Sequence, residues 1–470
     1  MPRSTIPDST QPEAPAGCLP RHKPPAVGSD LAKARRVRRK SAGSRGCVTK
    51  FLSIPALALL AIFLHGADTP GRAEDACSTS KALEEAPETF EAEIKALGDK
   101  GAQFQFDYSG EAFANLWGGV KRGGDYEGLA KISLKLDLQK LVQWNGATLY
   151  ASMLYPHGNG ITAQYVHDYN LLSNIDAYDS VRLFELWLQQ AFCDGRFSIR
   201  VGHLTTDNDF FVSNNSALFI NSVFGPLGTV FHDVTLPTYP VASDGVRLHY
   251  DFNPSLYVQA LAADDNPGFQ NINDRSGTRF GFNRSDGLLA FYEAGYAPAP
   301  PNSGSPLSAT YKLGGWFDSQ FHPDISAASS AHGDYGFYAV ADQPLYLAPG
   351  CAKDSPQGLS AFGRVSYAPD QRNAVVYYFD TGFNYTGLFP GRPKDLLGIA
   401  FSFERLGTDL QPPSATPALS HHEHVLEFTY LANLTDLFSV QPDIQYIINP
   451  GGIGKIPNAL VAGIRFNLAF

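Results

Sequence analysis

The sequence predicts an all-β protein, a transmembrane antiparallel β-barrel of the outer membrane with a short N-terminal periplasmic helix. Three observations lead to this prediction: an export signal near the N-terminus, runs of about ten residues in which polar and apolar side chains alternate, and a last strand that ends on an aromatic residue. Only 17% of the 470 residues are charged, and 32 Phe and 22 Tyr supply much of the apolar character. Because no series of long apolar runs accompanies them, a polytopic helical membrane protein is excluded.

Residues 1–73 form the predicted leader. A basic run from Arg35 to Lys40 precedes a largely apolar stretch from Phe51 to Leu64, and the small residues of Gly71-Arg72-Ala73 suit a signal peptidase. We expect a secretory signal peptide, with an N-terminal membrane anchor as the weaker alternative because the apolar stretch is short. The Pro-rich residues before Arg35 are unusual in a leader and suggest an over-extended start.

Residues 74–100 form the predicted periplasmic segment that precedes the barrel. A helix is expected from Lys81 to Lys100, because an apolar stripe at helical spacing runs through charged surroundings. After Gly101 the period changes to two and stays there, so residues 101–470 form the predicted barrel domain. The apolar stripe of the helix consists of Leu83, Phe90, Ile94 and Leu97.

Alternation along the barrel domain predicts which side chains face lipid. The apolar face of four expected strands includes Phe104, Phe106, Tyr108, Ile132, Leu134, Leu136, Phe184, Leu186, Leu188, Val246 and Leu248. The opposite face of the same strands includes Gln103, Gln105, Asp107, Lys131, Lys135, Asp137, Glu185, Trp187, Gln189, Arg247, His249 and Asp251. This second face is too polar for the core of a soluble sandwich, so one face suits lipid and the other suits water.

The length of the alternating runs sets the number of strands. Runs of about ten residues match a tilted strand that crosses a bilayer, whereas strands of soluble sandwiches are shorter. Seventeen segments qualify as candidates, and the short segment Thr278 to Asn283 is the weakest. Since bacterial single-chain barrels close with an even number, we expect sixteen strands, with eighteen as the alternative.

Charge and motifs exclude several classes of function. The net charge is -10, and the basic residues concentrate in the leader, so a nucleic-acid partner is not expected. The chain contains no zinc signature, glycine-rich phosphate loop or Ser/His/Asp order, and we therefore expect neither an enzyme nor a cofactor. His421-His422-Glu423-His424 resembles a metal cluster, but adjacent residues in a strand point apart, so no metal is expected.

Three cysteines remain beyond the leader. Cys77, Cys193 and Cys351 are far apart and odd in number. An oxidising compartment permits one disulfide among them, and free thiols are equally compatible with their spacing. The sequence assigns them no role.

The longest stretch without periodicity runs from Leu204 to Ser243, and we expect it to fold into the lumen. Its carboxylates, amides and aromatic rings suit a sugar, which presents hydroxyl groups and an apolar C-H face. Facing charges on the barrel wall predict a constriction with a transverse field. The candidate pore-lining residues of the loop are Asp207, Asp209, Phe211 and Asn221, and those of the wall are Lys131, Lys135, Asp137, Glu185, Trp187, Gln189, Arg200, Arg247 and Asp251.

Each of these assignments has an alternative. The long stretch could be an ordinary extracellular loop, and the wall charges could simply solvate a wide lumen. Trp187 and Trp316 fall on the inward register, but Trp is also common in the interfacial girdles of barrels.

The last strand alternates up to the terminal Phe470, as in outer-membrane proteins, and this resemblance implies recognition by the barrel-assembly machinery. The stretch from about Glu93 to Phe470 resembles the carbohydrate-selective porins of the OprB family. The resemblance implies a sixteen-stranded barrel in the outer membrane of a Gram-negative bacterium that passively admits glucose and related small sugars. Its expected partners are small sugars and outer-membrane lipids. Porins often form trimers, so we expect a homotrimer, with a monomer as the alternative. The motifs that carry it are Arg182-Leu183-Phe184-Glu185-Leu186-Trp187-Leu188, Arg200-Val201-Gly202, Leu218-Phe219-Ile220-Asn221-Ser222, Tyr311-Lys312-Leu313-Gly314-Gly315-Trp316, Pro390-Gly391-Arg392-Pro393 and Gln441-Pro442-Asp443-Ile444-Gln445-Tyr446.

Two other functions remain as alternatives. An outer-membrane or secreted β-rich hydrolase would need a nucleophile and base, or two carboxylates at catalytic spacing. A structural or adhesive barrel would have a lumen plugged by its loops. A diffusion porin is favoured because charged and amide residues continue along the inner face of many strands.

Overall fold

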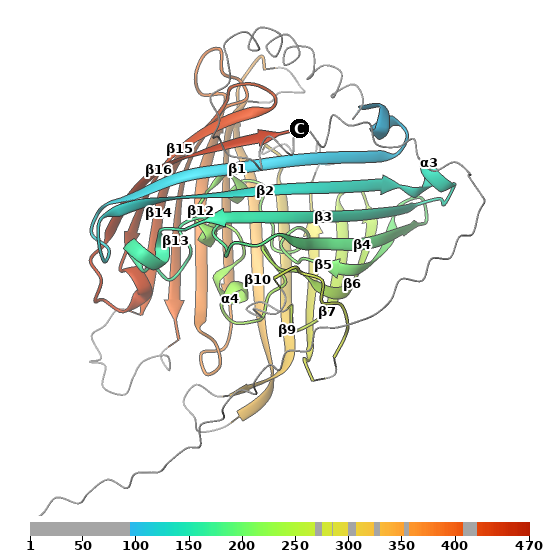
Figure 1. The fold of residues 1–470 in the computed structure, drawn as a ribbon, viewed down its shortest axis with the longest axis horizontal. Coiled ribbons are helices and arrows are strands. Elements are labelled where there is room, and N and C mark those ends of the chain that lie inside the picture. The colour runs from blue at the N-terminus through green and yellow to red at the C-terminus, as the bar shows by residue number, and fades with distance from the viewer. Residues whose placement is uncertain are drawn as a thin grey trace, which may run out of the picture. The chain divides into compact units, whose positions relative to one another are not determined.

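The computed structural model describes residues 95–267, 275–283, 285–298, 307–323, 330–351, 357–407 and 421–470. Within them, sixteen antiparallel strands close into one barrel, in which each strand pairs with its neighbours in sequence and the last pairs with the first (Figure 1). The strands are β1 (Ala102–Trp117), β2 (Gly123–Asp137), β3 (Ala147–Gly158), β4 (Arg182–Phe192), β5 (Phe197–Leu204), β6 (Ser243–Asn253), β7 (Leu256–Asp264), β8 (Leu288–Tyr296), β9 (Thr310–Pro323), β10 (Ser330–Leu347), β11 (Gly358–Tyr367), β12 (Val375–Thr386), β13 (Leu396–Leu406), β14 (His422–Asn433), β15 (Phe438–Ile448) and β16 (Ala459–Ala469).

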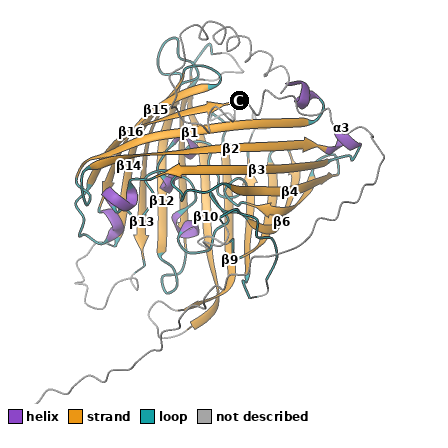
Figure 2. Ribbon diagram, viewed as in Figure 1, coloured by secondary structure: helices purple, strands orange, loops and turns teal. Residues whose placement is uncertain are grey.

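Helices are few and short in the described residues (Figure 2). They include α3 (Leu138–Val142), α4 (Gly228–Phe231) and a π-helical turn at Thr162–Val166. None of the described helices has the length and hydropathy needed to cross a membrane. The helix expected from Lys81 to Lys100 is described only from residue 95, where residues 95–99 are helical; its earlier part and the leader lie outside the described residues.

The structure confirms the fold class and the count of sixteen strands. The weakest candidate, residues 278–283, is not a strand. Alternation places side chains as expected on most strands: in β2, for example, Leu134 is 37% exposed on the outer face while the neighbouring Ser133 is 7% exposed on the inner one. A barrel that lies in lipid turns its apolar residues outward, which is why these large apolar side chains are exposed.

One expected lipid-facing residue is wrong, because β4 contains a bulge. Ser152 of β3 pairs with Glu185 and the next residue, Met153, pairs with Leu183, so Phe184 is the extra residue of the bulge. Phe184 is therefore buried on the inner side, where its ring lies 6.3 Å from that of Tyr239. Phe184 and Glu185 both point inward at this point of the strand.

The two ends of the barrel carry different connections. At the end that holds the first residue of β1 and the last of β16, β4 and β5 are joined by a tight turn in which Cys193, Asp194 and Gly195 all have positive φ. At the opposite end, residues 159–181 join β3 to β4 and residues 205–242 join β5 to β6. We call these connections loop A and loop B.

Both loops enter the barrel and form a hydrophobic core inside it. The residue pattern explains the position of loop B, since its apolar residues pack on inward-facing Phe291, Trp316, Tyr338 and Phe362 of the wall. Trp316 is fully buried in this core, so its inward register is correct and it is not part of an interfacial girdle. The loop members of the core are Ile161, Val166, Leu172, Phe210, Phe211, Leu218, Phe219, Ile220, Val223, Phe224, Leu227, Val230, Val234 and Leu236.

Candidate functional site

Loops A and B enclose a cavity of about 810 Å³. This volume lies in the range of small-molecule sites in proteins. Polar groups of both loops share the lining with apolar ones, and Arg364 of β11 completes it from the wall. The polar and charged lining residues include Ser173, Asn174, Asp176, Tyr178, Asp207, Asn208, Ser213, Ser222, Tyr239, Arg275 and Arg364.

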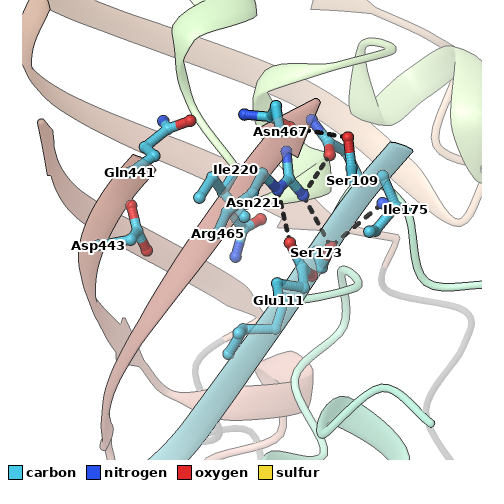
Figure 3. Close-up of polar contacts among 12 residues, drawn as sticks. Ser109, Glu111, Ser173, Ile175, Ile220, Asn221, Gln441, Asp443, Arg465 and Asn467 are labelled. Atoms are coloured by element: carbon cyan, nitrogen blue, oxygen red, sulfur yellow. Dashed lines mark hydrogen bonds and ion pairs between the residues drawn. The ribbon is translucent and has the colours of Figure 1, made fainter. Parts of the chain in front are cut away.

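Loop A is attached to the wall where the barrel closes. Arg465 of β16 forms an ion pair with Glu111 of β1, with 2.6 Å between Nε and Oε2. The same guanidinium donates from Nη2 to Ser173 Oγ at 3.1 Å and to Asn174 Oδ1 at 2.8 Å, so it joins both edge strands to the loop (Figure 3). The ion pair between Arg465 and Glu111 is buried, and the hydrogen bonds from Arg465 hold Ser173 and Asn174 at one side of the cavity.

Loop B is attached through its backbone to carboxylates of the wall. Glu427 of β14 accepts hydrogen bonds from the amides of Ile220 and Asn221 at 2.6 and 3.0 Å. The Asn221 side chain donates to Gln445 at 2.8 Å and accepts from the amide of Val223 at 3.0 Å. Asn221 is fully buried by these contacts, so the structure gives it an anchoring position rather than the solute-facing one expected from the sequence.

A second pair of wall residues holds the rest of loop B. Asp342 of β10 accepts from Ser213 Oγ at 2.6 Å and from the side chain of Asn215 at 3.1 Å. Arg364 donates to the carbonyl of Gly225 at 2.6 Å and also binds Asp380 of β12. Inward carboxylates and guanidinium groups on four strands therefore position the loop that narrows the lumen.

The predicted residues on β4, β5 and β6 come together as one cluster. Asp209 of loop B bridges two arginines, at 2.8 Å from Arg200 and 3.1 Å from Arg247. Arg200 also donates to Gln189 at 3.1 Å, and its guanidinium lies 4.2 Å from the ring centroid of Trp187. Trp187 stacks on Tyr150 of β3 at 4.9 Å between centroids, which places it inside the barrel rather than in a girdle.

Three further predicted residues lie nearby. Asp207 lines the cavity and accepts from Thr238 Oγ1 at 2.6 Å. Glu185 is buried and accepts from Thr205 Oγ1 at 3.4 Å. Lys131 of β2 lies 5.8 Å above the ring of Phe184, which is inward only because of the bulge.

The remaining predicted residues are placed less favourably for contact with a solute in the cavity. Phe211 lines the cavity but is almost fully buried against Phe291 and Tyr338, and its amide donates to Glu293. Lys135 is exposed near the end of the barrel at which β1 begins, and Asp251, near the same end, pairs with His249. Asp137 caps α3 by accepting from the amides of Gln139 and Lys140, so its carboxylate has a structural task in the turn at this end of the barrel.

The sequence did not single out loop A, Arg275, Arg364, Glu427 or Arg465. Alternation does put the strand residues on the inner face, but it cannot show which of them meet a loop. Loop A carries no period that would place it inside the barrel. The charge of these wall residues is nevertheless a usable signal, because a charged residue on the inner face of a strand needs a polar partner when a loop covers it.

The histidines of β14 are not arranged as a metal site. His422 stacks on Phe403 and His424 stacks on Phe401, while Glu423 points inward and accepts from the amides of Tyr169 and Gly451, each at 2.7 Å. Within the described ranges, no group of three His, Cys, Asp or Glu side chains could hold a metal ion. Cys193 and Cys351 are free thiols, and Cys77 lies outside the described residues.

Burial changes the protonation of loop residues. Asp176, which lines the cavity, has a pKa raised to about 6 by burial and by the nearby Glu111 carboxylate. Burial lowers the pKa of His232 in loop B to about 3, so this ring is neutral at neutral pH; its Nε2 lies 3.1 Å from Asn170 Oδ1. Loop B is thus joined to loop A by a neutral histidine.

A closed sixteen-stranded barrel with a polar inner wall and loops folded into its lumen defines a class of protein, the porins of the outer membrane. The chain belongs to the carbohydrate-selective porin, OprB family, whose model matches residues 121–470. It is therefore a sugar porin of the Gram-negative outer membrane, and the prediction of porin function is confirmed.

Individual relatives agree with this assignment. The chain is 26% identical to Porin B of Pseudomonas aeruginosa over 416 residues, which cover 80% of this chain and 88% of the relative. The high-pH structure of Pseudomonas putida OprB has the same fold, with a TM-score of 0.72, 24% identity, and coverage of 80% of this chain and 96% of that one. The low-pH structure of the same porin matches with a TM-score of 0.52 and 21% identity over 81% of this chain and 96% of that one.

Proposed function

We propose that glucose and related small sugars diffuse passively into the periplasm through the cavity between loops A and B. The observation that carries this proposal is the mixed lining of the cavity, in which Asn208 and Asp207 offer donors and acceptors beside the aromatic ring of Tyr239. Sugar hydroxyls need paired donors and acceptors, and their C-H faces pack on aromatic rings. No catalysed step is part of this function.

The charged cluster around Asp209 supports passage beyond the cavity. Arg200 and Arg247 share that carboxylate, Arg200 half-buried and Arg247 buried, so polar groups continue from loop B along β5 and β6. Fixed, paired charges provide hydrogen bonds to a neutral solute without trapping it, because no single strong site dominates. We assign Lys131, Glu185 and Gln189 to the same polar wall.

The proposal extends to the way the protein reaches its membrane. A signal peptide within residues 1–73 would direct export, and the barrel-assembly machinery would recognise β16, which ends next to Phe470. The end of the barrel that holds the start of β1 and the end of β16 would face the periplasm, as loops of porins are longer on the outside. Both a monomer and a homotrimer are compatible with this arrangement, and chemical cross-linking in native membranes distinguishes them.

Single-channel conductance in a planar bilayer, measured while glucose is titrated, tests the proposal. We expect stable conductance with a saturable block by glucose. Asn208→Ala should weaken that block, because it removes a lining amide. Asp251→Asn, on β6 near the other end, is the matched control and should leave the block unchanged.

The outcomes separate the candidate functions. Conductance without a saturable block by glucose would support the channel but contradict a sugar-binding site in the cavity. No conductance from well-folded protein would overturn the proposal in favour of a plugged structural barrel, and turnover of a carbohydrate would favour the hydrolase.

A further inference from the structure

Arg182 at the start of β4 is a buried arginine without a counter-ion. Its relative exposure is 1%, and its Nη1 donates to the hydroxyl group of Tyr178. Its Nε has no hydrogen-bond partner. Among the described residues, no carboxylate forms an ion pair with it. An uncompensated buried cation is costly, so such a group is retained where it meets an anion.

A second arginine lies at the same place. Arg275 is exposed, lines the cavity and forms no ion pair with any described residue. Both guanidinium groups approach the ring of Tyr178, at 5.7 Å for Arg182 and 5.9 Å for Arg275. Ser180 adds a buried hydroxyl group without a hydrogen-bond partner.

The backbone holds this arrangement in place. The carbonyl of Ser276 accepts from the amide of Leu183 at 2.8 Å, which joins the segment that carries Arg275 to the start of β4. Gly277 permits the approach, because its φ is 61° and a Cβ there would lie 2.2 Å from the carbonyl oxygen of Leu183. The two arginines are therefore brought together by a specific contact between segments far apart in the sequence.

Most arginines that are buried or half-buried in the described barrel differ from Arg182, because they have carboxylate partners. Carboxylate partners are present for Arg200 and Arg247 (Asp209), Arg279 (Asp286), Arg364 (Asp380) and Arg465 (Glu111). Those pairs serve the barrel itself or the attachment of loops. Arg275 lines the cavity together with Tyr178. Arg182 is not among the lining residues, but it approaches the same Tyr178 ring and keeps an Nε without a hydrogen-bond partner.

We propose that Arg182, Arg275 and Tyr178 form an anion subsite at the rim of the cavity, which takes the acidic group of an acidic monosaccharide. This inference rests on the proposed function, since it names a substrate class for the same passage. Guanidinium groups bind planar carboxylates and phosphates by paired hydrogen bonds. The adjacent lining suits the rest of such a molecule, because Asp207 and Asn208 present groups that bind hydroxyls rather than anions.

Block by D-glucuronate, compared with glucose, tests the subsite. We measure both in single channels of the full-length protein, in a phosphatidylcholine bilayer without lipopolysaccharide. The wild type should be blocked by glucuronate at concentrations about tenfold lower than by glucose, since a charge-assisted pair of hydrogen bonds is added. Raising the salt concentration should weaken the block by glucuronate and leave that by glucose unchanged.

Arg275→Gln is the main variant, because this side chain is exposed and its loss is compatible with folding. It should remove the advantage of glucuronate and leave the glucose block unchanged. Arg182→Gln should do the same if the barrel folds. Arg279→Gln, four residues further along and paired with Asp286, is the matched control and should behave as the wild type.

The outcomes distinguish this inference from the proposed function. If glucose blocks the wild type and glucuronate is no better, the subsite is wrong and the sugar passage stands. If neither sugar blocks, the proposed function fails first. If Arg275→Gln leaves glucuronate block intact but abolishes co-purification of lipopolysaccharide, the anion is a lipid phosphate and the acidic-sugar assignment is overturned.

Discussion

Asp176 shows how a single buried carboxylate links loop A to pH. Its pKa is raised from 3.8 to about 6 by burial and by Glu111, so the folded state holds a proton that the unfolded state has already released between these values. The free energy of unfolding contributed by this group therefore falls as pH rises through that window. Above pH 6 the cost of the buried charge is fully present.

We expect Asp176→Asn to stabilise the folded protein at pH 7.5 by about 3 kcal/mol and to have little effect at about pH 2.5, where the carboxyl is protonated in both the folded and the unfolded state. Urea unfolding in detergent micelles, followed by tryptophan fluorescence at the two pH values, measures this. Equal effects of the substitution at both pH values would contradict the assignment.

At the scale of elements, loop B is positioned by wall carboxylates that accept from its backbone. Glu427 accepts from two successive amides, and an amide side chain could accept only one of these bonds while placing its own donor against the other. The position of the loop therefore depends on the two acceptor oxygens of Glu427 and not only on the shape of its side chain.

Glu427→Gln should weaken the attachment of loop B to the wall by about 1–3 kcal/mol, which raises the population of displaced loops by about fivefold to more than a hundredfold. We expect larger and noisier single-channel conductance than in the wild type. Asp436→Asn, in an exposed turn at the other end of the barrel, is the control. Conductance that matches the wild type would show that the other anchors suffice.

The strands could be predicted from the sequence because each one has to satisfy lipid on one side and a polar lumen on the other. This constraint repeats every two residues, so it leaves a visible period in segments such as Gln103 to Glu111. The bulge at Phe184 could not be predicted, because one extra residue turns a side chain from the lipid side to the lumen side while the apolar residue itself stays the same in the sequence. The capping role of Asp137 could not be predicted either, because an aspartate at the end of a strand looks the same in the sequence whether or not a helix follows.

The site was only partly predictable. Arg200, Arg247 and Asp209 could be chosen because inward charges and an aperiodic loop are each visible in the sequence. Their anchoring counterparts on β10, β14 and β16 could not, because which carboxylate meets which amide depends on how two loops pack together inside the barrel. The sequence predicts that Asn221 lines the pore, whereas its side-chain amide binds Gln445 and holds loop B on the wall.

At the scale of the whole molecule, one ion pair spans the line where the barrel closes. Arg465 and Glu111 belong to β16 and β1, and both are buried. Removing one partner of a buried pair leaves the other uncompensated, which costs more than removing both.

Arg465→Met should destabilise the barrel by about 3–5 kcal/mol, because Glu111 remains as an unpaired buried charge. The double variant Arg465→Met with Glu111→Leu should recover part of this loss. Urea unfolding in detergent, together with the temperature at which the unheated form is lost on gel electrophoresis, measures both variants. Equal destabilisation by the single and the double variant would contradict the role of the pair.

The position of this pair also determines the order of events in assembly. Arg465 and Glu111 lie 354 positions apart, so they meet only after the final strand of the chain has arrived. Until then β1 and β15 present unpaired edges, and Ser173 and Asn174 have no guanidinium to bind. Sealing of the wall and narrowing of the passage thus depend on the same residue. A barrel arrested before its last strand would have unpaired strand edges, and its loop A would lack the contacts with Arg465. A cell that degrades barrels with unpaired edges therefore also removes pores whose passage has not been narrowed.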